Sequence, residues 1–338
     1  MQMELLGPHE LAHVFAQLPD LADMARVRAV CSLWRDTMSP PHIDGKQMAD
    51  VLRPAPDEIL KAACRAGSIE LAKYAVSRGA TNFDKGLHKA CKGGYTEIVD
   101  LMISCGATNF NCGLRGACKG GRKEMVELMI KRGAADFNNG LYGACNGNHK
   151  ELIDLMISRG ATNFDWGLCG ACRGGHKELA DLMISRGANN FNSGLRAACK
   201  GGHKELVDLV MRHGAFEFND GFYYACCSGN KELVDLMMRH GATNFNNGLI
   251  GACLNRHKEI AKLLISRGAS DLDFALGKAC CGGHKEIVEL IINCGATDFE
   301  WGLWGACYYG NSEVAKLLGN LAPRAVCAHC HRLGAEHV

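Results

Sequence analysis

The sequence has little net charge, no long apolar run and no catalytic signature, and each of these absences excludes a class of protein. Its 38 Lys and Arg nearly balance its 36 Asp and Glu, which argues against nucleic-acid or membrane-surface binding. No apolar run approaches the ~20 residues of a membrane span. The start of the sequence shows no basic segment followed by an apolar one, so we expect no signal peptide. Phosphate-loop, serine-hydrolase and zinc-protease motifs are missing, so we expect no enzyme, no cofactor and no metal site.

Cysteine, by contrast, is abundant and evenly spaced. Ten of the 19 cysteines recur every 27 residues, at positions 64, 91, 118, 145, 172, 199, 226, 253, 280 and 307. A glutamate column from Glu70 to Glu313 keeps the same step, without insertions. Self-similarity at one fixed period is the signature of a solenoid of stacked repeats.

Each repeat reads as two short helices. In the second repeat, Leu87, Ala90 and Cys91 share one face of a helix of about two turns that we expect to stop at the following glycines. A second helix follows, with Gly94 as its expected N-cap and Glu97 at the third position, where a glutamate reaches back to the cap amide. Helices this short are marginal alone and need neighbouring repeats to cover their apolar faces.

The periodic cysteines and histidines are interpreted as structural. Each column cysteine follows an alanine on the apolar side of a helix, and neighbouring repeats at ~8–10 Å are too far apart for a disulfide ladder. Histidine recurs at 149, 176, 203, 257 and 284, once per repeat, which cannot gather the ligands of a zinc site. We expect buried thiols and a turn role for the histidines.

The repeat resembles the ankyrin repeat. The resemblance lies in Gly194-Leu195, Ala198-Cys199, the run from Gly201 to Leu209, and His213-Gly214-Ala215. The Thr-Pro of that family is missing and the unit is about six residues short of its 33-residue period. The resemblance implies an all-α, ankyrin-like solenoid of ten short helix–turn–helix repeats over residues 55–322, with the β-hairpin fingers reduced to turns.

The first 40 residues do not follow the repeat. Residues 5–38 resemble the F-box, a motif whose families dock on the Skp adaptor of a cullin–RING ubiquitin ligase. The matching residues are Pro8, Glu10, Leu11, Val14, Phe15, Leu18, Pro19, Leu21, Val30, Cys31, Trp34 and Arg35. Gly7 stands where the family usually has Leu. The alternative is a small helical cap on the solenoid, with Phe15 and Trp34 as its core.

Two further segments flank the expected array. Residues 41–54 form a proline-containing connector between residues 1–40 and the repeats. The tail, residues 323–338, holds Cys327 and Cys330 in a C-x-x-C-H pattern. Haem attachment or a zinc site are the chemical interpretations of that pattern, and a flexible tail is the structural one, which we adopt.

A partner is expected on the concave face formed by the short first helices. There the residues after Gly-Leu and after the column cysteine vary between repeats, and they are four positions apart on one helix side. The face is basic in its first half and apolar or aromatic in its second, and aromatic and Arg side chains are the usual interface anchors. The expected partner-binding residues are Arg115, Lys119, Tyr142, Trp166, Arg173, Arg196, Lys200, Tyr223, Trp301, Trp304 and Tyr308. Random drift of a duplicated surface is the alternative.

Together these patterns predict an adaptor protein. The F-box-like segment would bind a Skp-type adaptor of a cullin ubiquitin ligase, and the array would recruit a target protein for ubiquitination. The alternative is an ankyrin scaffold with a helical cap and no ligase link. An F-box joined to a short-period ankyrin array is similar to proteins of large DNA viruses. We expect a monomer in the cytoplasm. If the chain is viral, that is the cytoplasm of the host cell.

Overall fold

The computed structural model describes residues 56–321, which contain twenty α-helices and no β-strand. The predicted F-box-like segment, the connector and the tail lie outside these residues. The chain divides into two compact units, one ending at Thr162 and one beginning at Asn163. Each unit is described by itself.

The first unit contains eight helices in four repeats. They are α4 (Pro56–Ala66), α5 (Ile69–Ser77), α6 (Phe83–Gly93), α7 (Thr96–Ser104), α8 (Phe110–Gly120), α9 (Lys123–Lys131), α10 (Phe137–Gly147) and α11 (Lys150–Ser158). Even-numbered helices are the first helices of their repeats, and odd-numbered helices are the second.

The second unit contains twelve helices in six repeats. They are α12 (Phe164–Gly174), α13 (Lys177–Ser185), α14 (Phe191–Gly201), α15 (Lys204–Arg212), α16 (Phe218–Ser228), α17 (Lys231–Arg239), α18 (Phe245–Leu254), α19 (Lys258–Ser266), α20 (Leu272–Gly282), α21 (Lys285–Asn293), α22 (Phe299–Tyr308) and α23 (Ser312–Leu321).

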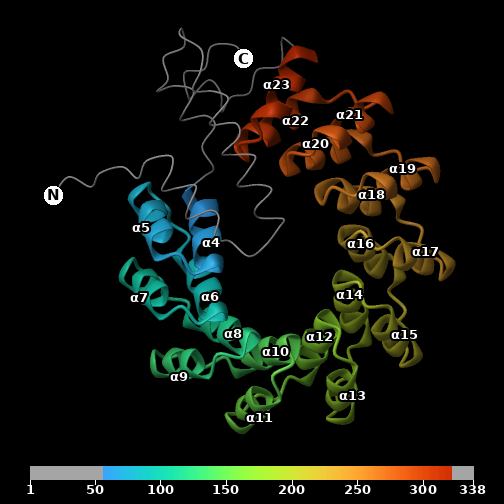
Figure 1. Cartoon of the computed structure of the whole chain (residues 1–338). Helices are drawn as coiled ribbons and strands as arrows, with labels where there is room; N and C mark the ends of the chain where they lie inside the picture. Colours follow the sequence, from blue (N-terminus) through green and yellow to red (C-terminus); the bar gives the residue numbers. More distant parts are fainter. Residues whose placement is uncertain (1–55, 322–338) are drawn as a thin grey trace. The chain divides into compact units, whose positions relative to one another are not determined.

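Within each unit the helices stand in two rows (Figure 1). The first helices pack closely on one another along their row, whereas neighbouring second helices barely touch. A row whose members pack more closely lies on the inner side of a curved stack. In each unit, therefore, the first-helix row forms the inner side, as the sequence predicted for the partner-binding face.

The first helices are longer than the sequence suggested. They begin at the recurring phenylalanine, so that α8 has 11 residues, about three turns rather than two. The cause is the residue before the phenylalanine: the Asn109 side chain accepts a 2.9 Å hydrogen bond from the Cys112 N–H and caps the helix.

The predicted cap of the second helices was wrong. Gly94 is the left-handed C-cap of α6, with φ 82°, and α7 starts after Tyr95, one residue later than expected. Glu97 therefore stands at the second helical position, too early for a capping box. It keeps a favourable place near the positive end of the helix dipole.

The turn between repeats is short and replaces the ankyrin finger, as predicted. Gly106, at φ 106°, and Ala107 close α7, with their N–H groups donating to Ile103 and Met102 in a Schellman motif. The N–H groups of Thr108 and Asn109 then donate to the Asp84 carboxylate of the preceding repeat, both at 2.9 Å. This side-chain clasp joins consecutive repeats where a longer finger would use backbone pairing.

The same clasp recurs along both units. Its acceptor is the Asp or Asn that follows the helix-starting residue, at positions 57, 84, 111, 138, 165, 192, 219, 246 and 273. Each accepts from the backbone about 24 residues further on, at 2.6–2.9 Å to the first donor.

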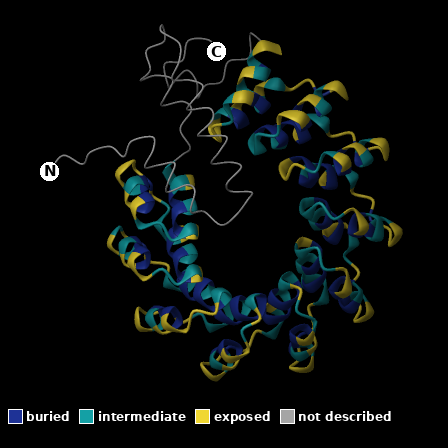
Figure 2. Cartoon of the chain, viewed as in Figure 1, coloured by how far each residue is buried: buried dark blue, intermediate teal, exposed yellow. Residues whose placement is uncertain are grey.

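The core of each unit lies between its two rows (Figure 2). In the second repeat Leu87, Ala90 and Cys91 are fully buried, as are Val99 and Met102 opposite them. Nine of the ten column cysteines are 0% exposed, and Cys307 in the last full repeat is half-buried. All described cysteines are free thiols, which confirms the predicted packing role.

Candidate functional site

In the first unit, the first-helix row carries a group of positive charges. Lys61 and Arg65 on α4, His88 and Lys92 on α6, and Arg115 and Lys119 on α8 occupy the same two positions of successive repeats. Lys89 lies beside His88 on α6. On α10 the same two positions hold a half-buried Tyr142 and a buried Asn146, so the charge ends there.

The electrostatic consequences appear at His88 and Lys89. Burial, together with the charges of Arg65, Lys92, Lys61 and Arg115, lowers the pKa of Lys89. Burial lowers the pKa of His88 to about 4, and Arg115 and Lys89 add to the effect. His88 is therefore neutral at physiological pH, with Nδ1 at 2.9 Å from the Cys112 carbonyl oxygen, to which it donates.

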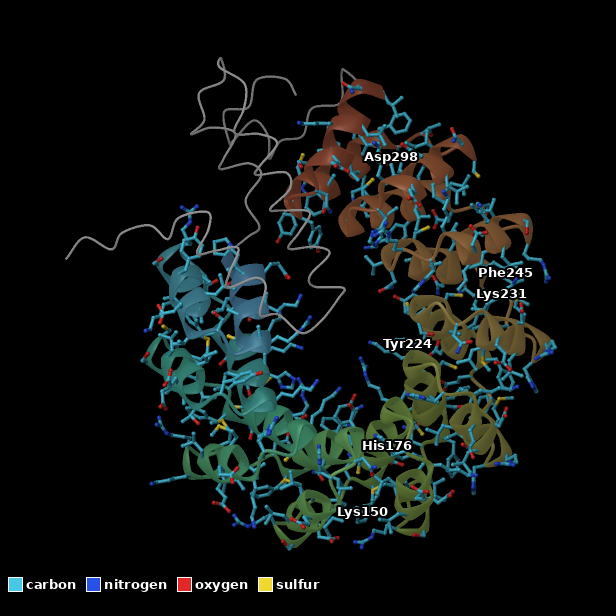
Figure 3. All side chains as sticks on the ribbon, viewed as in Figure 1. Lys150, His176, Tyr224, Lys231, Phe245 and Asp298 are labelled. Atoms are coloured by element: carbon cyan, nitrogen blue, oxygen red, sulfur yellow. The ribbon has the colours of Figure 1, made fainter. Side chains whose placement is uncertain are left out.

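In the second unit, Arg196 and Lys200 on α14 lie against side chains of the next repeat. The Arg196 guanidinium lies 3.0 Å from Asp220 and 3.3 Å from Glu217, both of the next repeat. The Lys200 ammonium lies over the Tyr224 ring at 5.3 Å. Tyr224, labelled in Figure 3, is also in edge contact with the half-buried Tyr223.

Near the end of the second unit, aromatic side chains gather on α20 and α22. Trp304 and Tyr308 are one turn apart and stacked, with 43% and 58% of their surface exposed. Trp301 is half-buried because it packs over Gly277 and stacks on Phe274 at 4.8 Å. Trp301 therefore packs between two repeats, whereas Trp304 and Tyr308 are exposed to solvent.

The two remaining predicted positions lie on α12. Trp166 is 45% exposed in the first turn of the helix, and Arg173 is half-buried in its last turn. The predicted residues thus form local groups rather than one continuous site. The first unit holds the cations and Tyr142. The second unit holds the pair Arg196 and Lys200 and, separately, the aromatic group.

Several residues of these groups were missed from the sequence. Lys61 and Arg65 lie two periods before Arg115 and Lys119, the first partner-binding residues predicted, so extending the columns backward would have found them. Lys89, Tyr224 and Lys278 occupy a position that is otherwise Gly or Ala in the described repeats. A large side chain in a column of small ones was the available signal.

Two of the periodic histidines, His257 and His284, have the structural role predicted for the column. His257 and His284 lie 3.1 and 3.0 Å from backbone carbonyls of the preceding repeat, at the end of its first helix. In residues 56–321 no group of three or more His, Cys, Asp or Glu could hold a metal ion. No helix of this part of the chain is long and apolar enough to cross a membrane.

Comparison with known proteins identifies the repeats. Residues 195–273 match a family model of ankyrin repeats in three copies. Among solved structures, 46% of the chain aligns with 84% of the crystal structure of the human ASB11 ankyrin repeat domain, at 22% sequence identity and a TM-score of 0.35. A search of curated protein sequences found no match. Ankyrin-repeat folds are typically non-enzymatic scaffolds that bind other proteins.

Proposed function

We propose that this ankyrin-repeat chain is a protein-binding adaptor whose partner docks on the first-helix row. The observation that carries the proposal is the contrast between the buried side and the solvent side of each first helix. Leu, Ala and Cys recur on one side and are buried, apart from Phe222 in place of one Leu and the half-buried Cys307, while the two positions on the solvent side change chemistry from repeat to repeat. Arg115, which forms no ion pair in the described chain, and the exposed Trp304 and Tyr308 are of the residue types that anchor interfaces.

The test compares matched variants of the two rows. Trp304→Ala/Tyr308→Ala removes exposed side chains of the first-helix row, and Lys231→Ala/Arg239→Ala removes exposed side chains of α17 in the second row (Figure 3). We expect the first variant to lose proteins that the wild-type chain captures from cell extract, as quantified by mass spectrometry, and the second to retain them. Equal retention by both variants would contradict the proposal for this part of the row.

We further propose that the chain recruits its target to a cullin ubiquitin ligase through residues 5–38. The support is the sequence resemblance to the F-box, in residues outside the described part of the chain. Tethering would place the bound target at high effective concentration near the ligase.

Binding to a purified Skp-type adaptor tests the ligase link. We expect the full chain to bind, and Leu11→Asp and Trp34→Ala to abolish binding while the helical circular dichroism of the array is unchanged. A wild-type chain that does not bind the adaptor would leave the scaffold without a ligase link, the alternative stated above.

A further inference from the structure

Several cations of the first-helix row in the first unit form no ion pair with a described residue. We define the basic face as Lys61, Arg65, Lys89, Lys92, Arg115 and Lys119. Lys89, Lys92 and Arg115 form no ion pair with any residue of the described chain. In the second unit the equivalent of Arg115, Arg196, has two carboxylates of the next repeat beside it.

The few acids on α4, α6 and α8 are already engaged. Asp57 and Asp84 accept backbone N–H groups in the clasps to the next repeat, and Glu58 pairs with Lys61 at 2.9 Å. The helix α8 has no acidic residue. At the position of Asp220 the first unit has the neutral Asn139. At the position of Glu217 it has Asp136, which forms no ion pair in the described chain and accepts the Asn139 N–H at 3.0 Å as the N-cap of α10. Within the described residues, no ion pair relieves the mutual repulsion of Lys89, Lys92 and Arg115.

We propose that the basic face binds a short acidic segment of a protein partner. This inference rests on the proposed function, because it assigns a chemistry to part of the same first-helix row. A carboxylate-rich segment would place Asp or Glu side chains against Lys89, Lys92 and Arg115, in the way that Asp220 and Glu217 already lie against Arg196.

The size of the face fits a peptide. Three neighbouring first helices at ~8–10 Å per spacing span about 20 Å, the length of about six extended residues. Beyond α8 the row continues with Tyr142, which offers an aromatic contact in place of charge.

A nucleic acid fits less well. The second-helix row of the same unit carries exposed acids in every repeat, among them Glu97, Glu124 and Glu151. With the balanced charge of the whole chain, these acids oppose a long polyanion but leave a short segment on the basic face unaffected.

The test is fluorescence anisotropy with the full chain and a labelled peptide of about ten residues rich in glutamate. A peptide with glutamine at every glutamate and an oligothymidylate of similar length are the comparison probes. The test variant is Lys89→Glu/Lys92→Glu, in which a carboxylate replaces a repelled ammonium, so the fold is not weakened. Lys92→Glu alone changes only an exposed side chain. The control, Lys131→Glu/Lys150→Glu, makes the same charge change on exposed lysines of α9 and α11 (Figure 3).

We expect the acidic peptide to bind, the glutamine peptide not to bind, and the test variant to weaken binding by about tenfold, with the control within about twofold of wild type. Absence of binding, equal losses in test and control variants, or tighter binding of the oligothymidylate would each overturn the inference. A chain that fails here but still captures proteins through Trp304 and Tyr308 would refute the acidic partner and leave the proposed function standing.

Discussion

At the scale of single residues, the fold depends on a polar column that the sequence shows only as an Asp or Asn at the second position of each first helix from α4 to α20. The role of this column was not predicted, because a lone acceptor has no meaning until its donors, about 24 residues away, are placed beside it. The cysteine column, by contrast, was predictable, since its small apolar side chain fits the neighbouring alanines. Periodicity identified both columns. Side-chain chemistry alone predicted the burial of the cysteines, but it did not predict the hydrogen bonds of the Asp and Asn residues.

The clasp predicts a difference between two substitutions of Asp84. Asp84→Ala leaves the N–H groups of Thr108 and Asn109 without their acceptor, so we expect it to lower the free energy of unfolding by about 1–3 kcal/mol. Asp84→Asn should cost little, because Asn111 makes the same clasp one repeat on. Urea denaturation of both variants measures the difference, and equal losses would contradict the assigned role.

Burial predicts the reactivity of the thiols. It raises the pKa of Cys91 and of Cys118 to about 12, so their reactive thiolates are scarce in the folded chain. We expect iodoacetamide to modify the exposed Cys294 in the native protein and to leave Cys91 and Cys118 unmodified until urea unfolds the array. Peptide mass spectrometry assigns each site, and modification of Cys91 as fast as Cys294 would contradict the packed core.

His88 predicts a pH dependence of stability. Its pKa is about 4 in the folded chain and 6.5 without the fold, so the unfolded chain binds the extra proton first as the pH falls. The stability contributed by the neutral form is complete above pH 6.5 and is lost as the pH falls through about 4.

We expect His88→Gln, which keeps a donor for the Cys112 carbonyl, to remove about 1–2 kcal/mol of this acid destabilisation near pH 5. Urea denaturation between pH 4 and 7 measures it. The exposed His213→Gln is the control, and parallel pH profiles of wild type and His88→Gln would rule out the mechanism.

At the scale of helices, close packing of the first-helix row depends on glycine. A side chain at Gly116 would collide with the backbone carbonyl oxygen of His88 on α6, and one at Gly120 with that of Lys92. One repeat of the second unit has Ala197 at the position of Gly116, so a methyl group is accommodated there. Sequence reasoning assigned glycines to helix ends and overlooked the mid-helix Gly116, because close approach between helices is a tertiary property.

Gly116→Ala tests the close approach. Helix propensity alone favours alanine by about 1 kcal/mol, yet the collision with α6 should outweigh it and lower the stability by about 2 kcal/mol. Ala197→Gly should lower the stability by about 1 kcal/mol through propensity alone. Thermal denaturation of both variants measures the change in stability. A stabilised Gly116→Ala chain would mean that α6 and α8 lie further apart than the structure shows.

At the scale of the molecule, we propose separate tasks for the two rows. The described repeats were predictable in type and period from the sequence, and their inner row was correctly expected to be the first helices. The distribution of charge on that row was predictable only in part, because the sequence does not show which cations are paired. Arg115 and Arg196 occupy the same position of the repeat, yet of the two only Arg196 forms ion pairs within the described chain. The partner-binding role of the first-helix row is the central claim.

Site-specific photo-crosslinking tests that claim most directly. A photoreactive amino acid is placed in turn at Tyr142 and Trp304 in the first-helix row and at Lys150 and Lys231 in the second, and the full chain is irradiated in cell extract. We predict a discrete crosslinked protein from one or both first-row positions and none from the second row. Crosslinks to the same protein from Lys150 and Lys231, with none from Tyr142 and Trp304, would contradict the account.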